Sequence, residues 1–274
     1  WNYWIPEVFY EKNSLLDNDF NNQNEMKNQR TFSFLDIDFE RRSGEITLVL
    51  LNVLLLVFIV TYNYEQFFEI VEKSKLSAAT HERVNSVIFS IVMAVGVIMF
   101  YFKGGFNFDK KAKNLKRLSK IWIFLNGILI LSTIIKNSEY VSFYGLTYKR
   151  LGVYAFLILA IVGLVFTFLK ITKQKTNAYL FNQMVWYFYG TILLCSYVNW
   201  GNWITNYNIS VNKGVEPIFL SDLSFNDETR RDYFKLKKLD GQKSESSREE
   251  EIDSYQEKSF LSKALYYEFL NDKK

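Results

Sequence analysis

Residues 46–62 read ITLVLLNVLLLVFIVTY, a stretch without a charged side chain in which Asn52 is the one strongly polar residue. A helix needs about 20 mostly apolar residues to cross a hydrocarbon core about 30 Å thick, because only internal backbone hydrogen bonds survive without water. A buried helix of a soluble protein rarely continues this long without a charge. The stretch therefore predicts a membrane-spanning helix.

Four further windows share this character, at about 85–102, 118–135, 151–169 and 178–200. Serine, threonine and glycine recur within them, and such small residues let helices approach closely in lipid. Each window alone is compatible with a buried soluble helix, but five together favour a membrane protein. We predict an all-α fold, a polytopic transmembrane helix bundle of five spans at residues 45–203.

The composition of the 274-residue chain agrees with this fold class. Hydrophobic residues make up 49% and aromatic residues 18%, while the mean hydropathy is −0.05 because polar stretches dilute the apolar ones. The chain has two prolines, which is compatible with long uninterrupted helices. Cys195 is the single cysteine, and it excludes an internal disulfide and a cysteine metal site within this chain.

Polar stretches flank the predicted bundle. Residues 1–44 are rich in asparagine and aspartate and predict an extramembrane loop or segment, while residues 204–274 predict a soluble helical tail. Within the tail, the charged stretch 240–253 predicts a flexible linker between two helices, at 227–239 and 255–270. Between the first two spans, residues 64–73 place aromatic and charged side chains on opposite helix faces, which predicts an amphipathic helix on the membrane surface.

Lysine and arginine are distributed unevenly about the predicted spans. Thirteen lie on one side and seven on the other. Cytoplasmic loops of membrane proteins carry an excess of positive charge, so the first side is predicted to be cytoplasmic, with residues 1–44 inside and the C-terminal tail on the outer face. The thirteen, called the basic set below, are Arg30, Arg41, Arg42, Lys103, Lys110, Lys111, Lys113, Lys116, Arg117, Lys120, Lys170, Lys173 and Lys175.

Four stretches carry a resemblance to a known family: LDIDFERRSGEITLVLLNVLLLVF (35–58), HERVNSVIFSIVMAVGV (81–97), YGLTYKRLGVY (144–154) and NWGNWITNYNI (199–209). They resemble an uncharacterised family of bacterial inner-membrane proteins, domain of unknown function 4173, which is related to domain of unknown function 4153. The resemblance implies a multi-pass protein of the bacterial inner membrane but no activity or substrate. It also implies further spans before Trp1, because members of the family are longer.

Arg41 and Arg42 precede the first span at the level of the lipid headgroups. Paired guanidinium groups match the geometry of phosphate, so both are candidate contacts for an anionic lipid or ligand. The alternative is a basic flank at a helix start.

Residues 144–150, before the fourth span, form a compact motif. Gly145 is expected to adopt a positive φ and Thr147 to cap the following helix. Tyr144, Thr147 and Arg150 are further candidate contacts for a lipid or ligand, and the alternative role is to shape a tight helix start.

Asn52 and Asn126 are the main polar groups inside the first three spans. We expect them to form polar contacts between helices, and the alternative is that they bind a substrate. No aspartate, glutamate, lysine or arginine lies at the middle of a predicted span, which counts against a proton-coupled pump.

Catalytic, cofactor and metal sites are not predicted. His81, the only histidine, precedes Glu82, but a metal centre there would need further carboxylate ligands. Phosphate-binding loops, nucleophile elbows and zinc-protease motifs are absent from the sequence. The basic loop 103–120 is assigned to lipid headgroups rather than to nucleic acid.

Three functions remain open. The first is a non-enzymatic scaffold, sensor or regulatory subunit of a membrane complex, with the bilayer and either a membrane-protein partner or a second copy as its contacts. The second is a transporter or channel for a small or lipidic solute, with a polar cavity near Asn52 and Asn126. The third is an embedded enzyme acting on lipid or envelope substrates, for which the candidate residues are Glu45, His81, Glu82 and Glu139.

Overall fold

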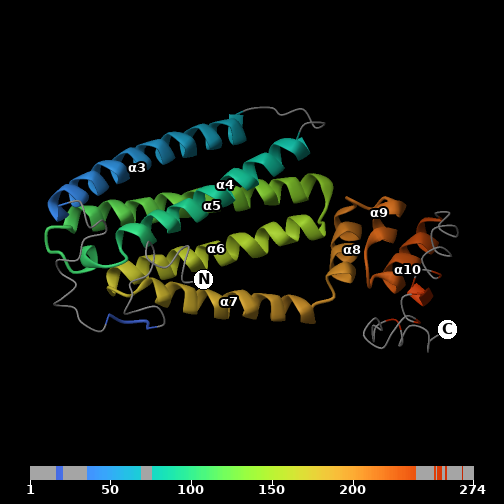
Figure 1. The fold of residues 1–274 in the computed structure, drawn as a ribbon. Coiled ribbons are helices and arrows are strands. Elements are labelled where there is room, and N and C mark those ends of the chain that lie inside the picture. Colours follow the sequence, from blue (N-terminus) through green and yellow to red (C-terminus); the bar gives the residue numbers. More distant parts are fainter. Residues whose placement is uncertain are drawn as a thin grey trace. The chain divides into compact units, whose positions relative to one another are not determined.

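The computed structural model describes residues 17–20, 36–68, 76–238, 250, 252–254, 257 and 267, with the backbone alone at 65–68 and 76–83. Every regular element among them is helical (Figure 1), which confirms the predicted all-α class for the described part of the chain. In chain order the elements are α3 (Ile37–Phe68), α4 (Leu76–Tyr101), the 3-10 helix η1 (Gly105–Asn107), α5 (Lys113–Tyr144), α6 (Tyr148–Thr172), α7 (Asn177–Tyr197), α8 (Trp200–Val211), α9 (Pro217–Asp222) and α10 (Asp227–Lys237).

The chain forms two compact units. Unit 1 contains Trp1–Asn137 and Val153–Ile192, and therefore most of α3 to α7. Unit 2 contains Ser138–Gly152 and Leu193–Lys274, so the turn between α5 and α6 belongs with α8, α9 and α10. The predicted bundle at 45–203 thus contributes residues to both units.

Four of the described helices are long and apolar enough to cross a membrane, and the chain is a membrane-embedded helical protein. These candidate spans are Ile37–Tyr64, Val84–Tyr101, Lys113–Tyr144 and Tyr148–Thr172. They correspond to the first four predicted windows. The first helix begins at Ile37, inside the segment 1–44 predicted to be extramembrane, because the acidic Asp38 and Glu40 stabilise a helix start there.

The fifth predicted window, 178–200, forms α7 but is not among the four, so the five-span count is not confirmed. Its tyrosines, Trp186 and the amides Asn182 and Gln183 lower the hydropathy of an otherwise uncharged helix. The window also ends earlier than predicted, at Tyr197. A new helix starts at Trp200, where Asn199 Oδ1 accepts a hydrogen bond from the backbone N–H of Asn202 at 3.1 Å.

Of the amphipathic helix predicted at 64–73, the described part, 64–68, is helical but belongs to α3, and its position on the membrane surface stays a prediction. Helix α3 continues without a break through Phe68, since neither glycine nor proline occurs between Gly44 and Gly96. Residues 69–75 lie outside the described residues. So do the predicted linker 240–253 and the predicted helix 255–270, apart from single positions.

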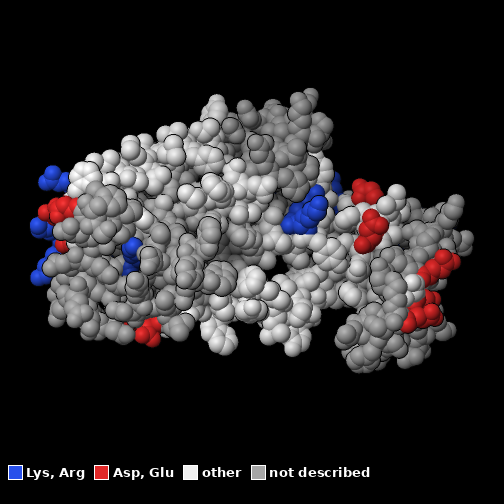
Figure 2. Space-filling view, in the orientation of Figure 1, with Lys and Arg blue, Asp and Glu red and all other residues white. Residues whose placement is uncertain are grey.

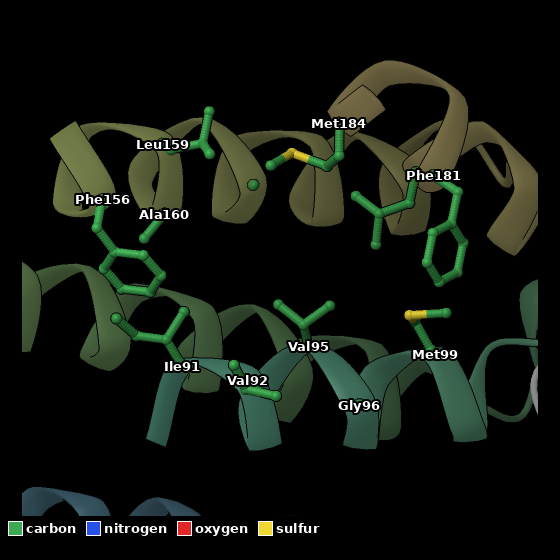
Figure 3. A pocket seen from close by; sticks show the side chains of 12 residues that line it. Ile91, Val92, Val95, Gly96, Met99, Phe156, Leu159, Ala160, Phe181 and Met184 are labelled. Carbon is green, nitrogen blue, oxygen red and sulfur yellow. The ribbon is translucent and has the colours of Figure 1, made fainter. Parts of the chain in front are cut away.

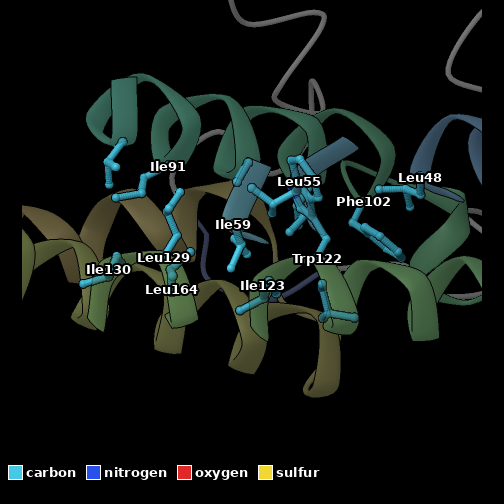
Figure 4. Close-up of a cluster of buried hydrophobic side chains, with 14 of the residues drawn as sticks. Leu48, Leu55, Ile59, Ile91, Phe102, Trp122, Ile123, Leu129, Ile130 and Leu164 are labelled. Atoms are coloured by element: carbon cyan, nitrogen blue, oxygen red, sulfur yellow. The ribbon is translucent and has the colours of Figure 1, made fainter. Parts of the chain in front are cut away.

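The core of unit 1 is a continuous apolar cluster to which α3, α4, α5 and α6 all contribute (Figure 4). Leu48, Leu129, Ile130 and Leu157 have no exposed surface in it. The candidate span of α5 is 44% buried, against 22% to 33% for the other three. Helix α5 is therefore the central helix of this unit.

Candidate functional site

The turn between α5 and α6 in unit 2 has the geometry that its sequence predicts. Gly145 has a φ of +82°, and its N–H donates to Val141 O at 2.8 Å, which ends α5 in a left-handed cap. Thr147 Oγ1 accepts from the N–H of Arg150 at 3.3 Å and so caps α6. The positive φ and the threonine cap are both confirmed.

Asn208 of α8 holds this turn through its side-chain amide. Its Oδ1 accepts from the Leu146 N–H at 2.6 Å, and its Nδ2 donates to Leu146 O at 3.0 Å and to Gly214 O at 3.2 Å. Asn208 is fully buried. The contact joins the two quoted stretches 144–154 and 199–209, which are far apart in sequence, and we call it the Asn208 clamp.

Two glycines allow the close backbone approaches around the clamp. A Cβ on Gly145 would lie 2.7 Å from Lys213 O and 2.8 Å from Asn208 Oδ1. A Cβ on Gly201 would lie 1.7 Å from Ser224 O, well inside any real contact. A side chain at Gly201 would force α8 away from the α9–α10 connection.

Arg150 and Tyr144 belong to the same turn. The guanidinium carbon of Arg150 lies 4.1 Å from the ring centroid of Tyr140 and 5.8 Å from that of Tyr144, and its Nη1 donates to Gly145 O. The structure thus brings together the three predicted contact residues Tyr144, Thr147 and Arg150. Arg150 and Thr147 make hydrogen bonds within the turn itself.

The remainder of unit 2 is held by a second buried amide. Asn226 donates to Thr205 Oγ1 and to Leu220 O, each at 2.8 Å, and so links α8, α9 and the start of α10. Asn226 stands at the N-cap position of α10, but its side chain makes no cap hydrogen bond there. Buried Arg230 and Asp227 pair at 3.0 Å within α10.

The two arginines at the start of α3 differ in their surroundings. Arg41 is paired with Asp38 at 2.7 Å and with Asp109 at 3.3 Å, and its side chain is only 12% exposed. Arg42 is exposed. Arg41 therefore ties the start of α3 to the connection between α4 and α5, and Arg42 faces outward.

Side chains from three other segments satisfy the C-terminal carbonyl groups of α4 and of the connection after it. The last carbonyls of a helix have no partner within it, and cations are favourable there. Fully buried Lys170 donates from Nζ to Phe102 O at 2.6 Å, and Asn177 donates from Nδ2 to Met99 O at 3.0 Å. Lys116 Nζ and Gln174 Nε2 each donate to Asn107 O at 2.7 Å.

This arrangement was not predicted from the sequence, where Lys170 was only one of thirteen flanking cations. Its position after a long apolar run was the one available signal, because a lysine there must either reach solvent or find an acceptor. We call the group formed by Lys116, Lys170, Gln174 and Asn177 the α4 cap.

The basic set gathers at one end of unit 1. The start of α3, the end of α4, the start of α5, the end of α6 and the start of α7 all lie at that end (Figure 1). Figure 2 shows blue side chains at the same end of the visible face. Every member of the basic set except Arg30 is among the described residues, and each belongs to one of these helix ends or to a connection between them.

Asn52 and Asn126 lie buried in helix contacts. Asn52 Nδ2 donates to Leu48 O of its own helix at 2.7 Å and to Leu118 O of α5 at 3.2 Å. Asn126 Nδ2 donates to Trp122 O at 2.8 Å, and its Oδ1 accepts from Ser90 Oγ of α4 at 3.3 Å. Both asparagines therefore link a neighbouring helix to α5.

The two residues considered for a metal, His81 and Glu82, have side chains outside the described residues. Within the part of the chain whose side chains the structure describes, no group of three or more histidine, cysteine, aspartate or glutamate residues could hold a metal ion.

Comparison with known families gives one result. The family model described as Domain of unknown function (DUF4153) matches residues 14–229. The sequence analysis named this family as a relative of domain of unknown function 4173. The match shows membership of the 4153 family and does not show membership of the 4173 family. Comparisons with curated proteins and with solved structures give no significant match. Because the matched residues make up most of the chain, this protein belongs to the domain of unknown function 4153 family.

Proposed function

We propose that this chain is a multi-pass protein of the bacterial inner membrane that acts as a non-enzymatic scaffold, sensor or regulatory subunit. In this proposal α8, α9 and α10 contact a partner protein, and the Asn208 clamp couples them to α5 and α6. The clamp is the observation that carries the proposal, since one buried side chain bonds both backbone groups of Leu146. A displacement of α8 would therefore be transmitted to the turn between two membrane helices.

The clamp also supports a fifth span. In this proposal the α5–α6 turn and α8 lie on the same side of the membrane, since Leu146 and Asn208 are in direct contact. Helix α6 is a candidate span that leads away from this turn. The chain must then return between Thr172 and Trp200, and α7 is the helix in that interval. We therefore assign α7 as a spanning helix.

The basic set supports the proposed orientation. With α7 as a span, the basic end of unit 1 faces the cytoplasm under the positive-inside rule. The α5–α6 turn and the helices α8 to α10 then lie on the outer face of the inner membrane. A partner for these helices would be another membrane protein or an envelope protein with an outer-face domain.

Exposed apolar side chains on unit 2 support a protein contact. Ile218 of α9 is 78% exposed and Leu236 of α10 is 79% exposed, although both helices also contribute buried residues. In this proposal the partner protein covers both side chains. Both positions are suited to a cross-linking experiment.

Photo-cross-linking in cells tests the proposal. A photoreactive amino acid at Ile218 or Leu236 is expected to trap one defined protein, and Asn208→Ala is expected to abolish the adduct. Asn206→Ala is the matched control, because among the described residues the hydrogen bonds of exposed Asn206 run within α8, to Asn202. Adducts to lipid alone, or an adduct unaffected by Asn208→Ala, would contradict the proposed coupling.

A carrier for a lipidic solute is the second candidate. It is favoured by an apolar cavity of about 370 Å³ bordered by α4, α6 and α7. The purified chain in liposomes would then accelerate the movement of a fluorescent phospholipid between leaflets. Movement at the rate of protein-free liposomes would rule this candidate out.

A further inference from the structure

The apolar cavity of unit 1 is a groove that opens to the surface of the helix bundle. Its walls are formed by one face each of α4, α6 and α7 (Figure 3). Val92 of α4 and Phe181 of α7, which line it, are 60% and 45% exposed. All twelve lining residues have aliphatic, aromatic or thioether side chains, or are glycine. Its volume of about 370 Å³ lies in the usual range for sites that bind small organic molecules, about 300–1,000 Å³.

Along the helix axis, the groove is nearly as long as the hydrocarbon layer of one lipid leaflet is thick. On α4 it extends from Ile91 to Met99, which corresponds to about 12 Å at a rise of about 1.5 Å per residue. Half of a hydrocarbon core about 30 Å thick is about 15 Å. Two of its three walls, α4 and α6, are candidate spans, so hydrocarbon is the surrounding medium on its open side.

One end of the groove adjoins the α4 cap. Met99 lines the groove, and its carbonyl oxygen accepts the hydrogen bond from Asn177. Lys170 bonds Phe102 O, three residues further along the chain. Leu180 and Phe181, in the first turns of α7, also line the groove, and Figure 3 shows Phe181 on the same side of the view as Met99. The apolar groove therefore leads directly to the basic end of unit 1.

We propose that this groove binds one acyl chain of an anionic phospholipid from the leaflet at the basic end. The phosphate of that lipid lies among the exposed members of the basic set, with Lys173, in the turn after α6, as the nearest exposed lysine along the chain to the groove-lining end of α7. The proposal rests on membrane embedding and is independent of any protein partner. The apolar groove fits the acyl chain, and the positive charge of the basic set fits the anionic headgroup.

The headgroup supplies the selectivity in this site. A tail in the groove and a tail in bulk lipid are equally apolar, so the hydrophobic effect does not distinguish them. A basic residue near the surface attracts an anionic headgroup by about 1 kcal/mol, which is about a fivefold preference. The groove therefore sets the position of the acyl chain, and the lysines select lipids with an anionic headgroup.

Photolabelling of the full chain tests this inference. The protein is reconstituted in phosphatidylcholine vesicles that contain a phosphatidylglycerol with a diazirine in its acyl chain, and the labelled peptides are mapped. The label is expected to concentrate on the groove faces of α4, α6 and α7. Excess unlabelled phosphatidylglycerol should suppress this labelling, and excess phosphatidylcholine should not.

Gly96→Phe provides a variant that fills the groove. Gly96 lines it, and a Cβ there meets no atom within 4 Å. Gly127→Phe on α5 is the matched control, because its Cβ also has open space and Gly127 does not line the groove. The groove label should be lost in Gly96→Phe and retained in Gly127→Phe.

Lys173→Gln tests the headgroup, with exposed Lys149→Gln in unit 2 as its control. The first variant should lower the preference for phosphatidylglycerol by about fivefold, and the second should leave it unchanged. Three results would each overturn the inference: labelling spread evenly over all lipid-facing helices, equal competition by phosphatidylcholine, or a cross-linked second copy of the chain in place of lipid.

Discussion

At the scale of single residues, the Asn208 amide illustrates why one side chain can fix a turn. A carboxamide carries an acceptor and two donors, and Asn208 uses both kinds at once on the N–H and C=O of Leu146. Alanine lacks both, and an ionised aspartate lacks the donors. Asparagine is the shortest residue that carries the acceptor and the donors on two separate atoms.

We expect Asn208→Asp to destabilise unit 2. The variant leaves the buried carbonyl of Leu146 and the partly buried carbonyl of Gly214 without their donor, at a cost of about 1–3 kcal/mol for the buried one. The measurement is thermal unfolding of the protein in detergent, with limited proteolysis at the α5–α6 turn. Asn206→Asp should behave like the natural chain, and equal effects of the two variants would contradict the clamp.

We also expect Gly201→Ala to loosen the packing of α8 against the α9–α10 connection. A Cβ at this position meets Ser224 O, which is backbone, so Gly201→Ala requires a backbone shift that costs about 1–3 kcal/mol or more. We expect faster proteolysis of the α8–α10 region. Gly190→Ala on α7, where a Cβ meets no atom within 4 Å, should have no comparable effect. Similar protease resistance in the two variants would disprove the close packing.

At the scale of elements, the end of α4 shows how a helix can stop near a membrane surface without exposing its last carbonyls to lipid. Residues 102–108 turn back and are mostly buried, so water does not satisfy these groups. The α4 cap does so with donors from α5, α6, the turn after α6 and α7. Lys170 contributes a cation where the helix dipole is negative.

Lys170→Glu is therefore expected to be strongly destabilising. It would place a negative charge in a fully buried position against carbonyl oxygens, and an uncompensated buried charge costs about 3–5 kcal/mol. Lys170→Met should be much milder, because Asn107 Nδ2 still donates to Phe102 O at 2.8 Å. The yield of monodisperse protein and its unfolding temperature report both effects.

Lys173→Glu, at an exposed position of the same basic end, is the control for charge alone. If Lys173→Glu lowered the unfolding temperature as much as Lys170→Glu, net charge at this end would explain the result and the buried hydrogen bond would not.

Among the helices and turns, the sequence predicts those features whose signals are local. The apolar windows located the first four spans, and Gly145 and Thr147 predicted the turn, because these signals are local. The hydropathy of α7 was ambiguous, since tyrosine, Asn182 and Gln183 lower the mean in a helix that still lacks charge. The partners of Asn208 and Lys170 were not predictable, because they lie 62 and 68 residues away in the chain.

At the scale of the whole molecule, the proposed topology makes one direct prediction. In a Cys195→Ser background, a cysteine replacing exposed Lys213 should react with a membrane-impermeant maleimide added from the outer side of the inner membrane. A cysteine replacing exposed Lys173 should react only after the membrane is opened. If both cysteines reacted from the same side, α7 would not cross the membrane, and a reversed pattern would reverse the orientation.

The separation of 62 residues between Leu146 and Asn208 has a consequence for biogenesis. The ribosome completes the α5–α6 hairpin well before it synthesises the asparagine that fastens its turn. During that interval the Leu146 backbone lacks its native partner, and an insertase or a chaperone can still reach the hairpin. A nascent chain arrested before Asn208 should therefore hold α5 and α6 less firmly than one arrested after α10.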